Sequence, residues 1–121
     1  MKPAYQAVYD AFIPIATAAG NTDGQPADNY LPGCFTYTDS EGISFSLSLN
    51  VGGINESSRG IAPSSSIAPG VDVWAPGDGV ESTSNGGGYG KIGGTSAAAP
   101  HAAGAMALRI ATIGRPTSTA E

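Results

Sequence analysis

The sequence predicts an α/β fold with a mainly parallel sheet, folded as one domain. Apolar, strand-like segments alternate along the chain with helix-like segments, which is the pattern of layered α/β proteins. The length of 121 residues suits a single domain. With 18 glycines, 9 prolines and only 12% charged residues, the composition indicates tight packing of small side chains rather than a solvated, disordered chain.

Two segments have the spacing of helices. Residues 4–12 carry Ala, Tyr and Val at helical intervals, and the alanine-rich segment 96–112 should be the longest helix. Small residues cover almost every face of this second segment, so we expect that helix to be buried all round. Gly104 within it suggests a neighbouring element that leaves no room for a side chain, and Gly104→Val should overpack a completed domain.

The strands are predicted from short apolar or alternating runs between turn-forming residues. Residues 43–49 alternate apolar side chains with serine, as a strand with one solvated face does, and the last two expected strands should pair as a hairpin across the glycines at 86–88. Loops are expected at 22–33 and 57–70, and a frayed end at 117–121. The expected strands are 13–18, 43–49, 71–75, 80–82 and 89–92.

Composition excludes several classes of partner and site. Five basic residues against ten acidic ones supply no basic stripe, so we expect no nucleic-acid partner. No apolar run approaches the roughly 18 residues of a membrane span, so no membrane contact is expected. A single cysteine, Cys34, excludes an internal disulfide. The first residues resemble a signal peptide only faintly, because Gln6, Asp10 and Pro14 interrupt the apolar run.

The densest chemical signal is Gly-Gly-Thr-Ser-Ala-Ala-Ala-Pro-His-Ala-Ala-Gly at residues 93–104. A hydroxyl between a glycine turn and a helix is well placed for a nucleophile, because glycine lets a substrate approach closely and the helix N-terminus offers free N–H groups. Physical reasoning alone favours a plainer interpretation, in which Thr95 or Ser96 is the N-cap of the helix.

The run at residues 94–104 resembles the active-serine motif of the subtilisin-like serine proteases, the subtilases. Ile-Ala-Thr-Ala-Ala-Gly-Asn at 15–21 is similar to the family's strand with the oxyanion asparagine, and Val-Asp-Val-Trp-Ala-Pro-Gly at 71–77 to a strand between the two motifs. Val-Gly-Gly at 51–53 is a weaker match. The resemblance covers residues 4–113 and implies the C-terminal portion of a subtilisin-like three-layer fold.

The resemblance also implies roles for individual residues. Ser96 would be the nucleophile, and the side chain of Asn21 with the Ser96 backbone N–H would stabilise the oxyanion. Ala18, Ala19 and Gly20 would form a wall of the specificity pocket. The implied activity is a serine endopeptidase that cleaves polypeptides through an acyl-enzyme outside the cell. Without the motif, Asn21 would be an ordinary loop asparagine after a glycine.

The sequence departs from the family in its general base. Subtilases supply an Asp and a His that precede the serine in the chain. The only histidine, His101, follows Ser96 by five residues and lies about 140° around the helix from it; by resemblance it is structural. No aspartate stands in the family's Asp-Ser/Thr-Gly setting. We therefore interpret residues 1–121 as a partial catalytic domain, with 114–121 as a frayed tail, that is inactive without an N-terminal half.

That interpretation has a physical consequence. A parallel sheet cut across its middle leaves an unpaired strand edge, so we expect exposed apolar surface near residues 13–18 and a chain that aggregates or depends on a partner. Leu, Ile, Val and Phe make up only about 17% of the sequence, and the interpretation accounts for this shortage because several central strands would lie in the other half.

Several other interpretations remain or are excluded. One is a non-catalytic remnant that binds a partner or folds poorly. Sedolisins share a similar serine motif but place an acidic group in the oxyanion role, so Asn21 and the Pro-His pair at 100–101 favour subtilases.

The Gly-x-Gly-x-x-Gly spacing at 88–93 follows a glycine turn and lacks a later acidic residue, so no dinucleotide is expected. Calcium occurs in many relatives, but no calcium-loop spacing is present, and we expect no metal or cofactor.

Overall fold

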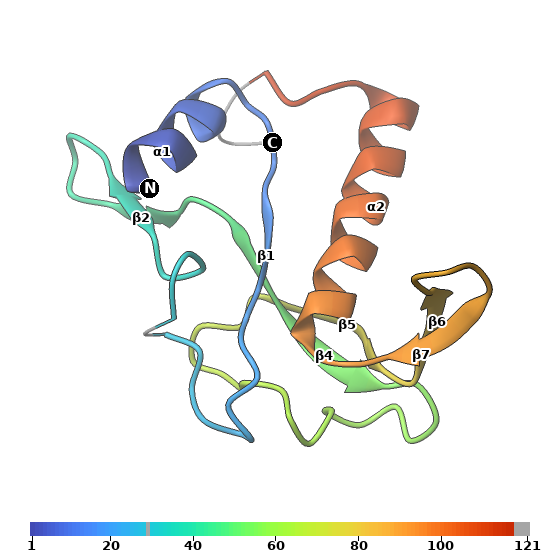
Figure 1. The fold of residues 1–121 in the computed structure, drawn as a ribbon. Helices are drawn as coiled ribbons and strands as arrows, with labels where there is room; N and C mark the ends of the chain where they lie inside the picture. The colour runs from blue at the N-terminus through green and yellow to red at the C-terminus, as the bar shows by residue number, and fades with distance from the viewer. Residues whose placement is uncertain (29, 118–121) are drawn as a thin grey trace.

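The computed structural model describes residues 1–28 and 30–117 and confirms an α/β fold with a parallel sheet (Figure 1). Residues 118–121 of the expected frayed tail lie outside the described residues. Two helices flank a three-stranded sheet and two small hairpins. The elements are α1 Lys2–Asp10, β1 Ala16–Ala18, β2 Thr36–Thr38, β3 Ser44–Ser46, β4 Leu49–Asn55, β5 Val73–Asp78, β6 Val80–Thr83, β7 Tyr89–Ile92 and α2 Thr95–Ile113.

The main sheet has the strand order β1-β4-β5, and both pairings are parallel. Strand β4 lies in the middle, with Val51 opposite Ala18 on one side and opposite Val73 on the other. Helix α2 contacts all three strands, and its first turns rest on the sheet while its later turns rise away from it (Figure 1). In the described part of the chain, β1 and β5 each have one partner only, as expected for a sheet with open edges.

Several of the sequence predictions were wrong in detail. The strand expected at 13–18 covers only Ala16–Ala18, because Ile13 is exposed and Pro14 has no backbone N–H to donate. The expected strand at 43–49 is divided: Ser44–Ser46 pairs with the unforeseen β2 in an antiparallel hairpin, and the chain then turns through Leu47 into β4. The strand expected at 71–75 begins only at Val73 and continues to Asp78. Strand β4 was not foreseen as a strand, since glycines at 52 and 53 are unfavourable for extended structure. The helices and the β6–β7 hairpin are confirmed.

The aromatic side chains of α1 hold that helix against the β2–β3 hairpin. The rings of Tyr5 and Phe35 meet edge to face with centroids 5.4 Å apart, and those of Tyr9 and Tyr37 lie 6.3 Å apart. None of the residues of α1 is buried, so these ring contacts carry the attachment of the helix to the hairpin. Figure 1 shows the two elements side by side, away from the start of α2.

The core is made of small side chains, which lets backbones approach closely. Val51, Ala75, Ala98 and Ala102 form the cluster between the sheet and α2. A Cβ atom added to Gly77 would lie 2.6 Å from the Cα atom of Gly53 on the neighbouring strand, closer than Cβ atoms ever pack. Such a core offers less apolar burial than one built of Leu and Ile, but it fixes the distance between the elements tightly.

The expectation that α2 is buried all round was wrong. Only Thr95, Ala97, Ala98 and Ala102 are buried, all in its first half. Leu108 and Ile113 are 72% and 60% exposed, and a side chain at Gly104 would meet nothing within 4 Å. Alanine on every face permits burial on every face but does not require it, and a three-stranded sheet is wide enough to cover one side only.

The close approach at Gly77 gives a test of this packing. We expect Gly77→Ala to destabilise the chain by about 1–3 kcal/mol, because the new methyl group would collide with backbone atoms of β4 that cannot rotate away. Gly90→Ala is the matched control: this strand glycine also has an ordinary φ, and its nearest neighbour would be 3.9 Å away. Urea unfolding followed by circular dichroism measures both; equal stabilities of the two variants would contradict the packing described.

Candidate active site

The start of α2 is tied to the turn that follows β1 through Thr95. This residue is fully buried, and its Oγ1 accepts a hydrogen bond from the Gly20 N–H at 3.1 Å. The Thr95 backbone N–H donates to Oδ1 of Asn21 at 2.8 Å, and the Thr95 hydroxyl donates to the same oxygen at 3.3 Å. The N-cap of α2 is Gly94, and no side chain caps the helix. The plainer interpretation of Thr95 or Ser96 as the cap was therefore wrong.

The side-chain amide of Asn21 has a defined orientation. A backbone N–H needs an acceptor, so the atom facing the Thr95 N–H is the amide oxygen and not the amide nitrogen. Its Nδ2 makes no hydrogen bond to the described residues and is free to donate to another molecule. A Cβ atom on Gly94 would lie 2.8 Å from this nitrogen, and the φ of 91° at Gly94 also favours glycine. Glycine at 94 therefore leaves room for Asn21.

Ser96 lies directly beside this arrangement on the solvent side. Its side chain is exposed, and its hydroxyl makes no hydrogen bond to any residue the structure describes. As the second residue of α2, it carries a backbone N–H that has no partner within the helix. Two N–H donors, one from the Asn21 side chain and one from the Ser96 backbone, thus flank the buried Thr95. An exposed hydroxyl next to two free N–H donors is an arrangement suited to acyl transfer.

The three residues expected to wall a specificity pocket precede Asn21. Ala18 ends β1 and is half-buried, whereas Ala19 is fully buried and its N–H donates to the Val51 carbonyl at 3.0 Å. Gly20 adopts a φ of 104°, which favours glycine. Ala19 as a whole is therefore enclosed in the core. The pocket wall stays a prediction for these three residues.

Within residues 1–28 and 30–117, no general base is brought to Ser96. His101 is exposed, and its Nδ1 is 2.8 Å from the Ala97 carbonyl oxygen one turn earlier in α2. Since a carbonyl only accepts, Nδ1 carries the proton in this contact. Among the described residues, no Asp, Glu or His side chain is hydrogen-bonded to the Ser96 hydroxyl. His101 thus bonds to its own helix and not to Ser96, as its position five residues after Ser96 led us to expect.

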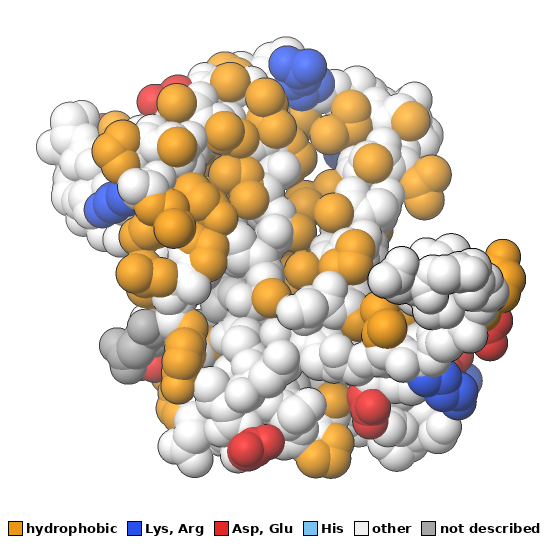
Figure 2. All heavy atoms as spheres, in the orientation of Figure 1, with side chains coloured by type: hydrophobic (Ala, Val, Ile, Leu, Met, Phe, Trp, Pro, Cys, Tyr) orange, Lys and Arg blue, Asp and Glu red, His pale blue; other side chains and the backbone are white. Residues whose placement is uncertain are grey.

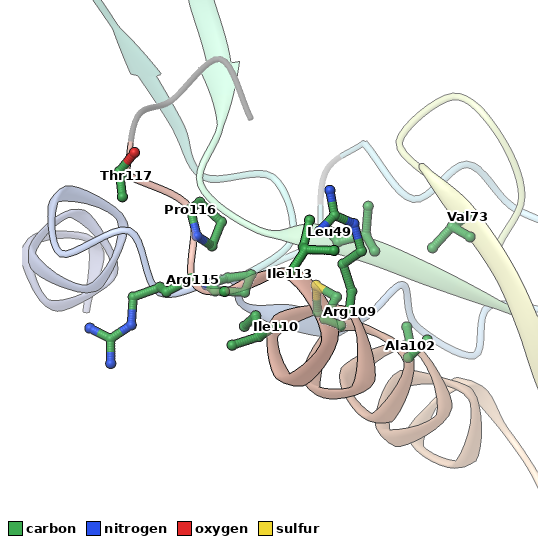
Figure 3. A pocket seen from close by; sticks show the side chains of 13 residues that line it. Leu49, Val73, Ala102, Arg109, Ile110, Ile113, Arg115, Pro116 and Thr117 are labelled. Atoms are coloured by element: carbon green, nitrogen blue, oxygen red, sulfur yellow. The ribbon is translucent and has the colours of Figure 1, made fainter.

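A cavity of about 660 Å³ lies at the other end of α2, away from Ser96 (Figure 3). It is bounded by the second half of the helix and by the beginnings of β4 and β5, with Leu49, Val73, Ile110 and Ile113 among its apolar lining. Figure 2 shows hydrophobic side chains gathered around a hollow in this face of the molecule. The cavity does not touch the residues of the candidate active site.

Two further observations bear on the site. No three His, Cys, Asp or Glu side chains within residues 1–28 and 30–117 are grouped so as to hold a metal ion. No helix in that part of the chain has the length and apolarity needed to cross a membrane.

Sequence reasoning missed the contribution of the loop at residues 62–67, whose backbone and serines support the turn around Asn21. Its consecutive serines gave no signal of that role.

Comparison with known proteins gives a consistent result. The model of the subtilase family, peptidase S8, matches residues 4–120. The chain is 38% identical to subtilisin-like protease 10 of Arthroderma otae over 120 residues, which are 98% of this chain and 27% of that protein. It is 38% identical to subtilisin NAT of Bacillus subtilis subsp. natto over 96 residues, 79% of this chain and 23% of that protein.

The fold agrees with these sequence matches. The crystal structure of a cold-adapted subtilisin-like serine proteinase superimposes with a TM-score of 0.70 at 30% identity, over 91% of this chain and 37% of that one. The chain spans about a quarter of the length of the two curated relatives described above. A family match over almost the whole sequence and a shared fold lead to one conclusion: this chain belongs to the subtilase family.

Proposed function

We propose that this chain is the C-terminal part of a subtilase catalytic domain and acts as a serine endopeptidase when further polypeptide supplies an Asp and a His. The observation that carries the proposal is the Asn21 side chain, held by the Thr95 N–H beside the exposed hydroxyl of Ser96. These two residues are 75 positions apart in sequence yet are brought together by the fold. The family match favours this over a sedolisin-type enzyme. We propose an extracellular location on the same family grounds.

In the proposed reaction, the Ser96 Oγ attacks the carbonyl carbon of a peptide bond while a base takes its proton. The carbonyl oxygen gains negative charge and accepts hydrogen bonds from Asn21 Nδ2 and the Ser96 backbone N–H. Both donors are already in place, so little reorganisation is needed as the charge develops. The peptide nitrogen leaves with a proton, an ester to Ser96 remains, and water hydrolyses that ester in a second, similar step.

A general base for Ser96 is missing from the part of the chain that the structure describes. An unaided serine hydroxyl is a weak nucleophile, and the proton that it must lose has no acceptor among the described side chains. Without a base, hydrogen-bond donors that stabilise the oxyanion give only a small part of the rate enhancement. The alternative function, a non-catalytic remnant that binds a partner, is favoured by the same observation, and the experiments below separate the two.

The placement of the additional polypeptide is supported by apolar surface on one side of the molecule. Strand β1 has an open edge, and Ile13 just before it is 44% exposed. Leu108 and Ile113 of α2 are exposed, and the 660 Å³ cavity lies beside the second half of α2, with Pro14, just before β1, in its lining. Exposed apolar surface and an unpaired strand edge favour association with another polypeptide. We propose that the segment carrying the Asp and His binds along β1 and the outer face of α2.

The first test is complementation. We expect the purified chain to hydrolyse no peptide and to take up no organophosphonate label, because Ser96 lacks a base. Fusion to, or mixing with, the N-terminal half of a subtilase catalytic domain should restore both, and Ser96→Ala should remove both again. Hydrolysis by the isolated chain that Ser96→Ala abolishes would refute the missing base, whereas no activity in any complemented form would favour the non-catalytic remnant.

The second test concerns the oxyanion donor. In the complemented protein, Asn21→Ala should lower kcat with little change in KM, because Nδ2 meets its acceptor fully only in the transition state. Removing one such donor in subtilisin is known to lower kcat by about 10²–10³-fold, and we take that value as the expected size. Asn85→Ala, at an exposed loop asparagine in the β6–β7 hairpin, is the control and should leave kcat unchanged. A similar loss in both variants would count against the assignment.

The third test concerns the outer face of α2. In the isolated chain, Gly104→Val should leave stability nearly unchanged or slightly raised, since the site is open and glycine is unfavourable in a helix by about 1 kcal/mol against Ala. In the complemented domain, the same substitution should destabilise by about 1–3 kcal/mol if another element packs against it. Thermal melts of both forms measure the difference. The same effect in both would show that this face stays uncovered.

A further inference from the structure

The position of Asn21 depends on the loop at residues 62–67 as well as on α2. Asn21 itself is exposed, so packing around its side chain does not hold it in place. The Thr95 N–H fixes the amide oxygen from one side. The backbone on either side of Asn21 must be fixed by something else if the free Nδ2 is to keep a constant direction.

Backbone hydrogen bonds from the 62–67 loop hold that segment. The Ser66 N–H donates to the Gly20 carbonyl at 2.9 Å. The N–H groups of Asp23 and Gly24 donate to the carbonyls of residues 64 and 65 at 3.1 and 3.0 Å. The loop therefore bonds to the chain just before and just after Asn21 and leaves Asn21 itself free to face outward.

A pair of hydroxyl groups joins the loop to the residue that directly follows Asn21. The Oγ of Ser66 lies 2.8 Å from Oγ1 of Thr22. Thr22 already uses its proton to donate to the Gln25 carbonyl at 3.0 Å, so Ser66 is the donor between the two hydroxyls. Ser66 is fully buried, so its hydroxyl cannot donate to water instead if the Thr22 oxygen is removed.

The same loop is anchored in the middle of the main sheet. Ser65 is also fully buried, and its Oγ accepts a hydrogen bond from the Gly53 N–H of β4 at 3.0 Å. It donates in turn to the Ser66 carbonyl at 2.8 Å. A continuous series of hydrogen bonds thus runs from β4 through Ser65 and Ser66 to Gly20 and Thr22, on the two sides of Asn21.

From this series of contacts we infer that Ser66 is a positioning residue of the oxyanion hole. It acts through Thr22 and Gly20, which it contacts, and does not touch the substrate. A Cβ atom on Gly20 would lie 2.9 Å from the Ser66 Oγ, so the hydroxyl sits directly against the backbone that carries Asn21. The inference rests on the proposed role of Asn21 as the oxyanion donor and adds a second support for it, independent of α2.

The test compares two pairs of variants in the 121-residue chain by amide hydrogen exchange. Thr22→Val removes the hydroxyl but keeps the shape, and Thr22→Ser keeps the hydroxyl. Ser66→Ala removes the donor, and Ser64→Ala is its matched control, because the Ser64 side chain makes no hydrogen bond to the described residues. The Thr95 N–H reports the position of Asn21, whose oxygen it contacts, and the Ala19 N–H, bonded to Val51, reports the sheet.

We expect exchange at the Thr95 N–H to accelerate by about 10-fold or more in Thr22→Val and in Ser66→Ala, as a local opening does, with Ala19 unchanged. Thr22→Ser and Ser64→Ala should match the unsubstituted chain. Equal acceleration at Ala19 and Thr95 would show that Ser66 is merely structural and would overturn the inference, as would unchanged exchange at Thr95. If Ser66→Ala fails to fold, Thr22→Val, at a half-buried residue, decides the question.

Kinetics of the complemented protein separates this inference from the proposed function. Thr22→Val should lower kcat by about 10-fold at unchanged KM, as expected for a misplaced transition-state donor, and Thr22→Ser should restore it. Unchanged kcat in Thr22→Val would overturn the positioning role even with Ser96-dependent hydrolysis intact. Absence of that hydrolysis in the unsubstituted complemented protein would overturn the proposed function instead, whatever the exchange at Thr95 shows.

Discussion

Helix α2 begins directly on the backbone of the sheet, and the placement of the site residues depends on that contact. Gly53 and Gly77 bring β4 and β5 so close that no side chain fits between them at this point. The Gly94 N–H then donates to the Gly77 carbonyl at 2.6 Å, which sets the height of the helix above the strands. From there Thr95 enters the core and meets Asn21. A side chain at Gly77 would push against the backbone of β4, and one at Gly94 would push against the Asn21 amide, so either would disturb the contact between the helix start and Asn21.

The close contact between helix and sheet also explains which parts of the fold could be predicted from the sequence. The serine motif is local, so a glycine turn leading into a helix was evident from the sequence, and the expected start at residue 96 lies one residue from the observed start at Thr95. Strand β4 was missed as a strand because glycine weakens extended structure on its own. In β4, glycine is needed at position 52 because a Cβ atom there would lie 2.5 Å from the Trp74 ring on the neighbouring strand. Such a tertiary contact cannot be recognised from the alternation of residues within the strand.

The candidate site shows a similar division. Local physical reasoning favoured an N-cap role for Thr95 or Ser96, yet Thr95 reaches across to the turn after β1 and Ser96 faces solvent. Asn21 stood out only through resemblance to a family, because nothing in its immediate sequence distinguishes a donor from a loop asparagine. The support from Ser66 was invisible for the same reason: its partners lie more than 40 positions away. The burial of α2 was overestimated, since alanine suits a covered face and an open face equally.

The hydrogen bond between Asn21 and Thr95 spans 74 positions of the chain, and this has a consequence for folding kinetics. Parallel strands require long crossovers, and the segments 19–48 and 56–72 must both close before the strands can align. Contacts so distant in sequence form late, because the entropy of the closing loops is lost before the contacts are gained. The contact that orients the Asn21 side chain therefore forms only in chains that have completed their sheet, and until then the exposed Ser96 has no ordered amide beside it.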